Sequence, residues 1–189
     1  WGRNFGVLLA LDTENGKPLY LSFVKSETVK DYEDAVASIE KRGYVIRGLI
    51  IDGKKSLFKS FSKYHVQIVR RYLTLNPRML ASRDLKTLVD KLHRIYEADF
   101  RSEYQAWKEK WKDTIARRSL HKDGRLHYVH QRLRVAMNSL DFYLPYLFTC
   151  QREDCQGMSN TNNKIEGTFT DLKKNLNNHS GLTQENRKR

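Results

Sequence analysis

The first fifty residues alternate short apolar runs with polar turns, which predicts two strands followed by a helix. Residues 5–11 and 19–24 are apolar and rich in strand-forming side chains, and an Asn-Gly pair lies between them. Such a pair between two strands is typical of a β-hairpin. Thr28 and Asp31 have the spacing of a capping box, after which apolar residues recur at helical spacing as far as Gly43. The chain is therefore expected to open with an antiparallel hairpin and a helix.

A third strand and a long helical stretch follow. Residues 44–51 form an apolar run that predicts a buried strand, ended by an Asp-Gly pair. Apolar positions then recur every three or four residues over 85–115, which indicates one long helix or two in tandem. Residues 126–144 and 165–176 carry further helical stripes. The pattern as a whole favours an α/β fold in which the strands come first and the rest of the chain is largely helical.

Composition excludes several classes of protein. The chain has 189 residues, of which 39% are hydrophobic and 11% aromatic, so it can form a core and is not wholly disordered. Its two cysteines exclude a disulfide scaffold and indicate a reducing compartment. No apolar run reaches the length of a transmembrane helix. We expect a cytoplasmic, nucleoid-associated protein, and the first residue, Trp1, suggests a fragment of a longer chain.

The positive charge lies almost entirely after the first 52 residues. The net charge is +13, and residues 1–52 sum to −1, so the rest of the chain carries +14. Residues 53–80 contain seven basic side chains and no acidic one. A solvated surface explains any single basic run, but three such runs (53–80, 101–134 and 173–189) favour a nucleic acid as the partner. The candidate nucleic-acid-binding side chains are Lys54, Lys55, Arg70, Arg71, Lys173 and Lys174.

Two carboxylates are candidates for a catalytic site. Asp52 follows the predicted third strand, and ligands collect at strand ends in α/β sheets. Glu166 follows the apolar Ile165 and flanks the stripe of the last helix. Taken singly, each has an ordinary explanation, a turn aspartate and a first-turn glutamate. Taken together within a basic chain, they suit phosphoryl transfer with two metal ions, because carboxylate oxygens are the ligands that Mg²⁺ prefers.

Four segments carry a resemblance to a known family: GRNFGVLLALD, GLIIDGKKSLF, QIVRRYLTLNP and SNTNNKIEGTFTDLKKNLNNHSGL. They resemble the catalytic domain of bacterial insertion-sequence DDE transposases related to the Mutator-like group. The resemblance implies an RNase H-like mixed sheet with an all-helical insertion between the second Asp and the Glu of the motif. The expected division is 1–75 and 151–180 for the core, 76–150 for the insertion and 181–189 for a polar tail.

The resemblance also implies the site and its partners. Asp52 would be the second metal-binding Asp and Glu166 the final Glu, holding two Mg²⁺ or Mn²⁺ ions between them. His179 lies within the family's last motif and is a candidate DNA contact. The implied activity is nicking of transposon ends and attack of the freed 3′-hydroxyl on target DNA. The implied partners are double-stranded DNA and a second copy of the chain.

The sequence departs from the family's pattern in two places. The first Asp of the motif would precede Trp1, and Asp12 is a poor substitute because it ends the first hairpin strand. The family's Cys-x-x-His element is matched only by Ser62 and His65, with Ser in place of Cys. Two alternatives therefore stay open, a truncated or domesticated DNA-binding relative without activity and an RNase H-type nuclease. His127 and His130 are expected on a helix, facing solvent or DNA, rather than on a metal.

Overall fold

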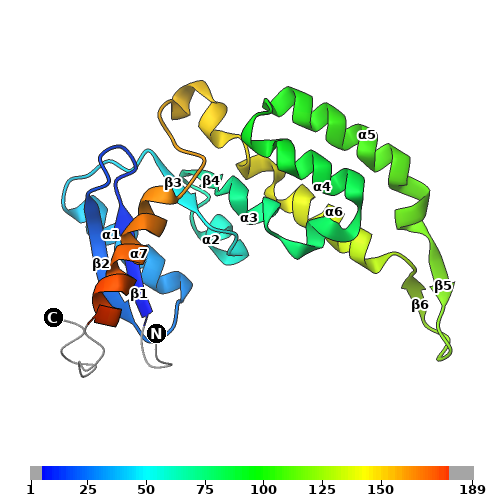
Figure 1. Cartoon of the computed structure of the whole chain (residues 1–189), viewed down its shortest axis with the longest axis horizontal. Coiled ribbons are helices and arrows are strands. Elements are labelled where there is room, and N and C mark those ends of the chain that lie inside the picture. Colours follow the sequence, from blue (N-terminus) through cyan, green and yellow to red (C-terminus); the bar gives the residue numbers. More distant parts are fainter. Residues whose placement is uncertain (1–5, 179–189) are drawn as a thin grey trace. The chain divides into compact units, whose positions relative to one another are not determined.

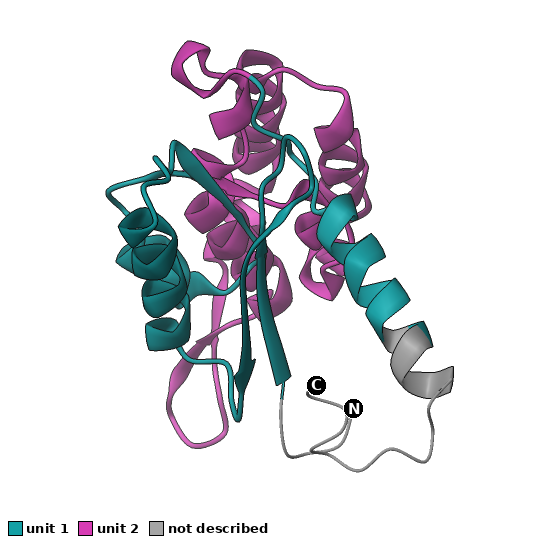
Figure 2. Ribbon diagram, turned by 90° about the vertical axis from the view of Figure 1, so that its left-hand side faces the viewer, with its two compact units in different colours: residues 1–66, 157–189 teal, residues 67–156 magenta. Residues whose placement is uncertain are grey.

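The computed structural model describes residues 6–178 and is mixed α/β with small sheets, divided into two compact units. The first unit comprises residues 1–66 and 157–189, and the second comprises residues 67–156 (Figure 2). The first unit contains β1 (Gly6–Leu11), β2 (Pro18–Val24), α1 (Val29–Lys41), β3 (Gly48–Ile51), α2 (Lys55–Ser60) and α7 (Asn163–Asn178). The short strand β4 (His65–Ile68) spans the boundary between the units.

The predicted hairpin is present as the antiparallel pair β1 and β2, in register at Leu9 and Leu21. Its turn is closed by the backbone N–H of Asp12, which donates to the Lys17 carbonyl at 2.9 Å. Gly16 has a φ of +74°, a conformation that favours glycine and explains the Asn-Gly signal. The local sequence therefore specifies the turn of this hairpin.

Helix α1 begins at the predicted capping box. The Thr28 hydroxyl accepts from the backbone of Asp31, and the Asp31 carboxylate accepts from the backbone of Thr28. Gly43, with a φ of +88°, follows its last residues. Helix α1 packs against β1 and β2, and α7 packs against β1. The hairpin consequently lies between α1 on one side and α7 on the other (Figure 2).

Strand β3 is shorter than the expected 44–51, because residues 44–47 do not join it and Val45 is 87% exposed. It pairs with β4 in a two-stranded sheet separate from the hairpin. A Cβ on Gly48 would lie 2.8 Å from the His65 carbonyl oxygen and would collide with the Met158 methyl group. The pairing of β3 with β4 therefore depends on glycine at position 48.

The second unit is almost entirely helical (Figure 1). Its elements are α3 (Arg70–Thr74), η1 (Pro77–Ala81), α4 (Arg83–Asp90), η2 (Lys91–His93), α5 (Glu97–Ala116), β5 (Arg118–Leu120), β6 (Leu126–Tyr128), α6 (Gln131–Tyr143), η3 (Leu144–Tyr146), η4 (Thr149–Gln151) and η5 (Glu153–Cys155). Its core includes Leu85, Leu92, Phe100, Leu140 and Tyr143. Trp107 is 5% exposed and stacks on Tyr104, so it belongs to this core.

The structure confirms one of the two alternatives expected for residues 85–115 and corrects the expectation for residues 126–144. The apolar stripe over 85–115 is two helices in tandem, α4 and α5, separated by η2. The stripe that begins at 126 is not helical at its start, because residues 126–128 form strand β6 and the helix begins at Gln131. Gly124, with a φ of +79°, turns the chain back and lets 118–120 pair with 126–128.

The boundaries between the units also differ from the expected division. Residues 67–75 and 151–156 were expected in the core, and the structure groups them with the helical unit. The reason is a set of buried hydrogen bonds within that unit. The Gln67 amide donates to the Leu147 carbonyl at 3.0 Å, and its carbonyl oxygen accepts from the Cys150 backbone at 2.9 Å.

Candidate functional site

Asp52 lies where the sequence placed it, directly after β3, and its side chain is exposed. Its Oδ1 accepts a hydrogen bond from the backbone N–H of Gly53 at 2.9 Å. Its backbone carbonyl accepts from the N–H of Lys54 at 2.8 Å, which turns the chain sharply into α2. The turn therefore fixes the backbone of Asp52 and orients one carboxylate oxygen.

Beside Asp52, the side chains of Glu27, Tyr32 and Lys54 form a polar network in the first unit. The Tyr32 hydroxyl donates to the Glu27 carboxylate. The Lys54 Nζ donates to the Glu27 carbonyl at 2.7 Å, lies 3.6 Å from its carboxylate, and sits 5.4 Å from the centre of the Tyr32 ring. Burial raises the pKa of Tyr32, and the charges of Glu27 and Asp52 raise it further. Tyr32 therefore stays protonated and can only donate to the carboxylates around it.

Lys54 was expected to bind nucleic acid, and its contacts indicate a second role. Because its ammonium group is held by Glu27 and Tyr32, it ties the end of β3 to the start of α1. The side chain is 32% exposed, so a phosphate can still reach it from solvent.

Glu166 lies in the first turn of α7, with an exposed side chain. Its backbone N–H donates to the Asn162 carbonyl at 3.0 Å, and its carbonyl accepts from the Thr170 hydroxyl at 2.8 Å. A carboxylate in a first helical turn is stabilised by the helix dipole. The helical placement predicted for Glu166 is confirmed.

The start of α7 is anchored to the hairpin turn by one lysine. The Lys164 Nζ donates to the carbonyl of Thr13 at 2.6 Å and to that of Glu14 at 2.8 Å. These contacts join segments about 150 positions apart in the chain. Because Lys164 lies two residues before Glu166, it holds the turn that carries this carboxylate against the sheet. Lys164 was not among the expected site residues, because no local signal marks it.

The donor chemistry of Asp52 and Glu166 fits a divalent cation such as Mg²⁺, because both offer carboxylate oxygens to solvent. The two side chains belong to the same compact unit. Within residues 6–178, however, neither belongs to a group of three or more convergent His, Cys, Asp or Glu side chains. Within the described part of the chain, therefore, neither carboxylate has two further ligand groups converging with it. Asp12 does not serve as such a group, because its carboxylate accepts hydrogen bonds within the hairpin turn.

The remaining basic candidates fall in different places. Lys55 is exposed at the start of α2, and Lys174 is exposed on α7, where its Nζ lies 3.9 Å from Asp171. Arg71 is exposed in α3 of the second unit. The side chain of Lys173 and the whole of His179 lie outside the described residues.

Arg70 is not where a DNA-binding side chain is expected. It is 2% exposed, and its guanidinium donates to the Leu147 carbonyl at 2.9 Å and the Leu92 carbonyl at 2.6 Å. Its Cζ lies 4.8 Å from the centre of the Phe148 ring. Burial lowers the pKa of the guanidinium, and the neighbouring Cys150 raises it. Arg70 therefore crosslinks backbone segments inside the second unit, and the expected role in nucleic-acid binding does not fit this placement.

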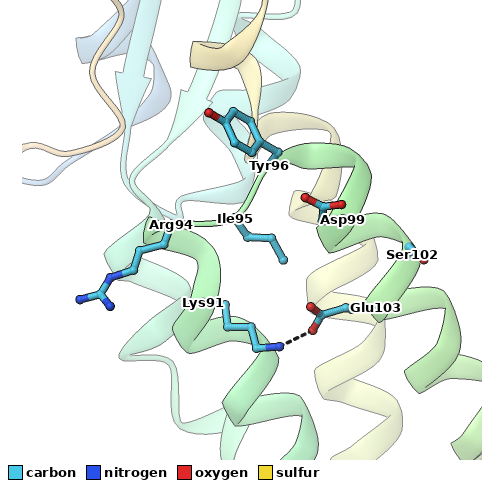
Figure 3. Close-up of a pocket in the computed structure, with 7 residues that line it drawn as sticks. All are labelled: Lys91, Arg94, Ile95, Tyr96, Asp99, Ser102 and Glu103. Carbon is cyan, nitrogen blue, oxygen red and sulfur yellow. Dashed lines mark hydrogen bonds and ion pairs between the residues drawn. The ribbon is translucent and has the colours of Figure 1, made fainter.

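The second unit carries an open groove of about 460 Å³ between the end of η2 and the first turns of α5 (Figure 3). Lys91 and Glu103 form an ion pair across it at 2.7 Å. Tyr96, 73% exposed, and Asp99 also line it, while the Arg94 side chain points away from these residues. The lining carries both signs of charge, so the groove does not select for an anion.

The basic run 101–134 was expected to face a nucleic acid, but the β5–β6 hairpin within it was not expected. The available signal was the Asp-Gly pair at 123–124, which is typical of a hairpin turn. The apolar spacing that begins at 126 led to a helix instead.

Within the described residues, no helix is long and apolar enough to cross a membrane. No protein-family model, curated protein or solved structure matches the chain.

Proposed function

We propose that this chain is the catalytic domain of a DDE transposase with an RNase H-like core, acting on double-stranded DNA. The observation that carries the proposal is the position of the two carboxylates. Asp52 follows the short strand β3, which comes after the hairpin and α1. Glu166 lies in the first turn of α7, which follows the 90-residue helical unit (67–156) and packs on the hairpin. This order of elements agrees with the arrangement that the sequence resemblance implies.

Asp52 and Glu166 would hold the metal ions, two Mg²⁺ or Mn²⁺ in the expected state. When bound, such ions stabilise the attacking and the leaving oxygen of a phosphoryl transfer. The chain's own groups set the positions of the two ligands. The turn at Gly53 and the Glu27–Tyr32–Lys54 network fix Asp52, and Lys164 fixes the first turn of α7. Lys55 and Lys174 supply exposed positive charge for the DNA backbone in the same unit.

One observation favours a second candidate, a relative that binds DNA without cutting it. Within the described residues, neither Asp52 nor Glu166 belongs to a group of three or more convergent metal-binding side chains, whereas the resemblance implies three acidic residues. Under this alternative the chain keeps the basic surface and lacks nicking and joining. An RNase H-type nuclease remains as a further alternative, distinguished by its substrate.

The test compares metal binding and strand transfer in single variants. Asp52→Asn and Glu166→Gln should each weaken Mn²⁺ binding, followed by water proton relaxation, and abolish joining of a labelled transposon-end duplex to a plasmid. Asp171→Asn is the matched control, because Asp171 is also exposed on α7. DNA affinity in EDTA should stay unchanged in all three variants.

The outcomes separate the candidates. Mn²⁺ affinity equal to wild type in both Asp52→Asn and Glu166→Gln would remove the proposed metal site. Mn²⁺ binding and DNA binding without nicking or joining would favour the inactive relative. Cleavage of an RNA–DNA hybrid without joining would favour the nuclease. A homodimer on DNA is also part of the proposal, and the mass of the complex in light scattering tests it.

A further inference from the structure

The hairpin β5–β6 and its flanks, residues 117–134, form a distinct element of the second unit that we call the basic ribbon. Its strands pair antiparallel, with Arg118 opposite Tyr128 and Leu120 opposite Leu126. The turn is closed by the His121 backbone N–H, which donates to the Arg125 carbonyl at 2.9 Å. The ribbon leaves the end of α5 and returns into α6, extending past both helices (Figure 1). Its backbone conformation is therefore set by its own hydrogen bonds.

The ribbon is exposed over nearly its whole length. All three residues of β5 are exposed, as is every residue of the turn 121–125. Leu120 and Leu126, an opposed pair near the tip, are 70% and 63% exposed. A two-stranded hairpin without a buried face is marginally stable by itself. Such an element is best explained by a partner that it contacts.

The charge of the ribbon indicates the kind of partner. Between 117 and 134 there are six basic side chains and one acidic side chain, a net charge of +5. The basic residues are Arg117, Arg118, Lys122, Arg125, Arg132 and Arg134. The acid, Asp123, is used within the turn, where it accepts from the Arg125 backbone at 3.1 Å and lies 3.0 Å from the His121 ring nitrogen. The surface presented to a partner is therefore cationic.

Two of these guanidinium groups converge on one aromatic ring. The Cζ atoms of Arg118 and Arg134 lie 4.6 Å and 3.8 Å from the centre of the Tyr128 ring. Arg118 also donates to the Tyr128 hydroxyl at 2.5 Å. Holding two like charges beside one ring costs repulsion that a bound anion relieves, and the ring restricts both side chains before the anion arrives. This arrangement favours binding of phosphate groups.

We propose that the basic ribbon lies in the major groove of B-form DNA, with Arg118 and Arg134 contacting backbone phosphates. The major groove is about 12 Å wide and admits a two-stranded β-ribbon. The major groove of A-form RNA is too narrow for side chains to read, so duplex RNA is the poorer partner. The exposed Leu120–Leu126 pair can contact thymine methyl groups, which line the same groove. The inference rests on the proposed function only in naming DNA as the substrate.

The test measures DNA affinity of the full chain without metal. Fluorescence anisotropy in EDTA follows binding to a duplex of about two helical turns over a series of salt concentrations. The double variant Arg118→Gln/Arg134→Gln should weaken binding roughly tenfold or more, and should reduce the salt slope by about two. The matched control is Arg101→Gln/Lys112→Gln, which removes the same charge from exposed positions on α5. The control should change affinity less than about twofold, and circular dichroism should show equal helix content in all variants.

Comparison of partners tests the groove assignment. Wild type should bind duplex DNA more tightly than duplex RNA of the same sequence. Leu120→Ser should weaken binding to duplex DNA and leave binding to duplex RNA unchanged. Equal affinity for the two duplexes, or equal losses in the ribbon and control variants, would overturn the proposal in favour of diffuse electrostatic attraction. Tighter binding to phosphatidylserine vesicles than to DNA, lost in Leu120→Ser, would overturn it in favour of a membrane surface.

The failure of this inference is distinguishable from failure of the proposed function. If the ribbon variants bind DNA like wild type, in a chain that still performs strand transfer, DNA binding by the basic ribbon is refuted and the transposase proposal is unaffected. Loss of DNA binding in the ribbon variants, in a chain that shows neither metal binding nor joining, would support DNA binding by the basic ribbon and refute the transposase proposal.

Discussion

The placement of Arg70 makes a prediction that separates the structure from the sequence-based expectation. We consider Arg70→Met, which keeps most of the hydrocarbon volume and removes the guanidinium. The change deletes the donors to the carbonyls of Leu147 and Leu92 and the contact with the Phe148 ring. The Leu147 carbonyl keeps its hydrogen bond from Gln67 at 3.0 Å, whereas the Leu92 carbonyl loses its bond from the guanidinium.

The size of the effect follows from these contacts. A buried carbonyl left without a donor costs about 1–3 kcal/mol. Loss of a desolvated cation–π contact adds about 1–2 kcal/mol. Removal of a buried charge offsets part of this sum. The guanidinium is desolvated, and its hydrogen-bond partners within the described residues are the Leu147 and Leu92 carbonyls and the Cys150 sulfur, with no carboxylate among them. We expect a net loss of about 2–3 kcal/mol in the free energy of unfolding, or a fall of roughly 1 M in the urea midpoint.

The assay is urea unfolding followed by tryptophan fluorescence, since Trp107 and Trp111 both lie in the second unit. Arg78→Met is the matched control, because Arg78 belongs to the same basic run and its side chain is exposed. The control should shift the free energy of unfolding by less than about 0.5 kcal/mol. An unchanged midpoint in Arg70→Met, together with weaker DNA binding, would refute the structural role and return Arg70 to the nucleic-acid surface.

Three further predictions concern the first unit. Thr28→Ala should cost about 1 kcal/mol of stability by removing the N-cap of α1, measured by chemical denaturation, and no change would contradict the cap. The hydrogen bond from Thr28 lowers the pKa of Asp31, so Asp31 stabilises the fold above its unfolded-state pKa and loses that contribution as pH falls through the folded value. The difference in melting temperature between wild type and Asp31→Asn should therefore shrink below about pH 4, and a constant difference would count against it. Gly48→Ala should destabilise the β3–β4 pair by about 1–3 kcal/mol, because the added methyl group meets the His65 carbonyl, and an unchanged melting temperature would argue against that close approach.

The parts of the fold that the sequence predicted well are those encoded over a few neighbouring residues. The capping box at Thr28 and the positive φ of Gly16 need no distant partner, so the hairpin and α1 could be placed from local patterns alone. The same holds for Glu166, whose helix is marked by its own apolar stripe. The anchor of that helix could not be predicted, because Lys164 bonds to carbonyls about 150 positions away and any exposed lysine has the same local signature.

Charge shows the limit of sequence reasoning in the second unit. Arg70 and Arg118 each lie next to another arginine in the sequence, and composition assigns both to a basic surface. The structure buries Arg70 against backbone carbonyls and leaves Arg118 exposed beside Tyr128. The difference arises because Arg70 follows the buried Ile68 and Val69, whereas Arg118 belongs to a hairpin that lies outside the core. A basic segment therefore predicts a polyanion-binding surface only after the packing of its backbone is known. By that criterion, residues 117–134 expose their positive charge to solvent, whereas the Arg70 guanidinium is buried.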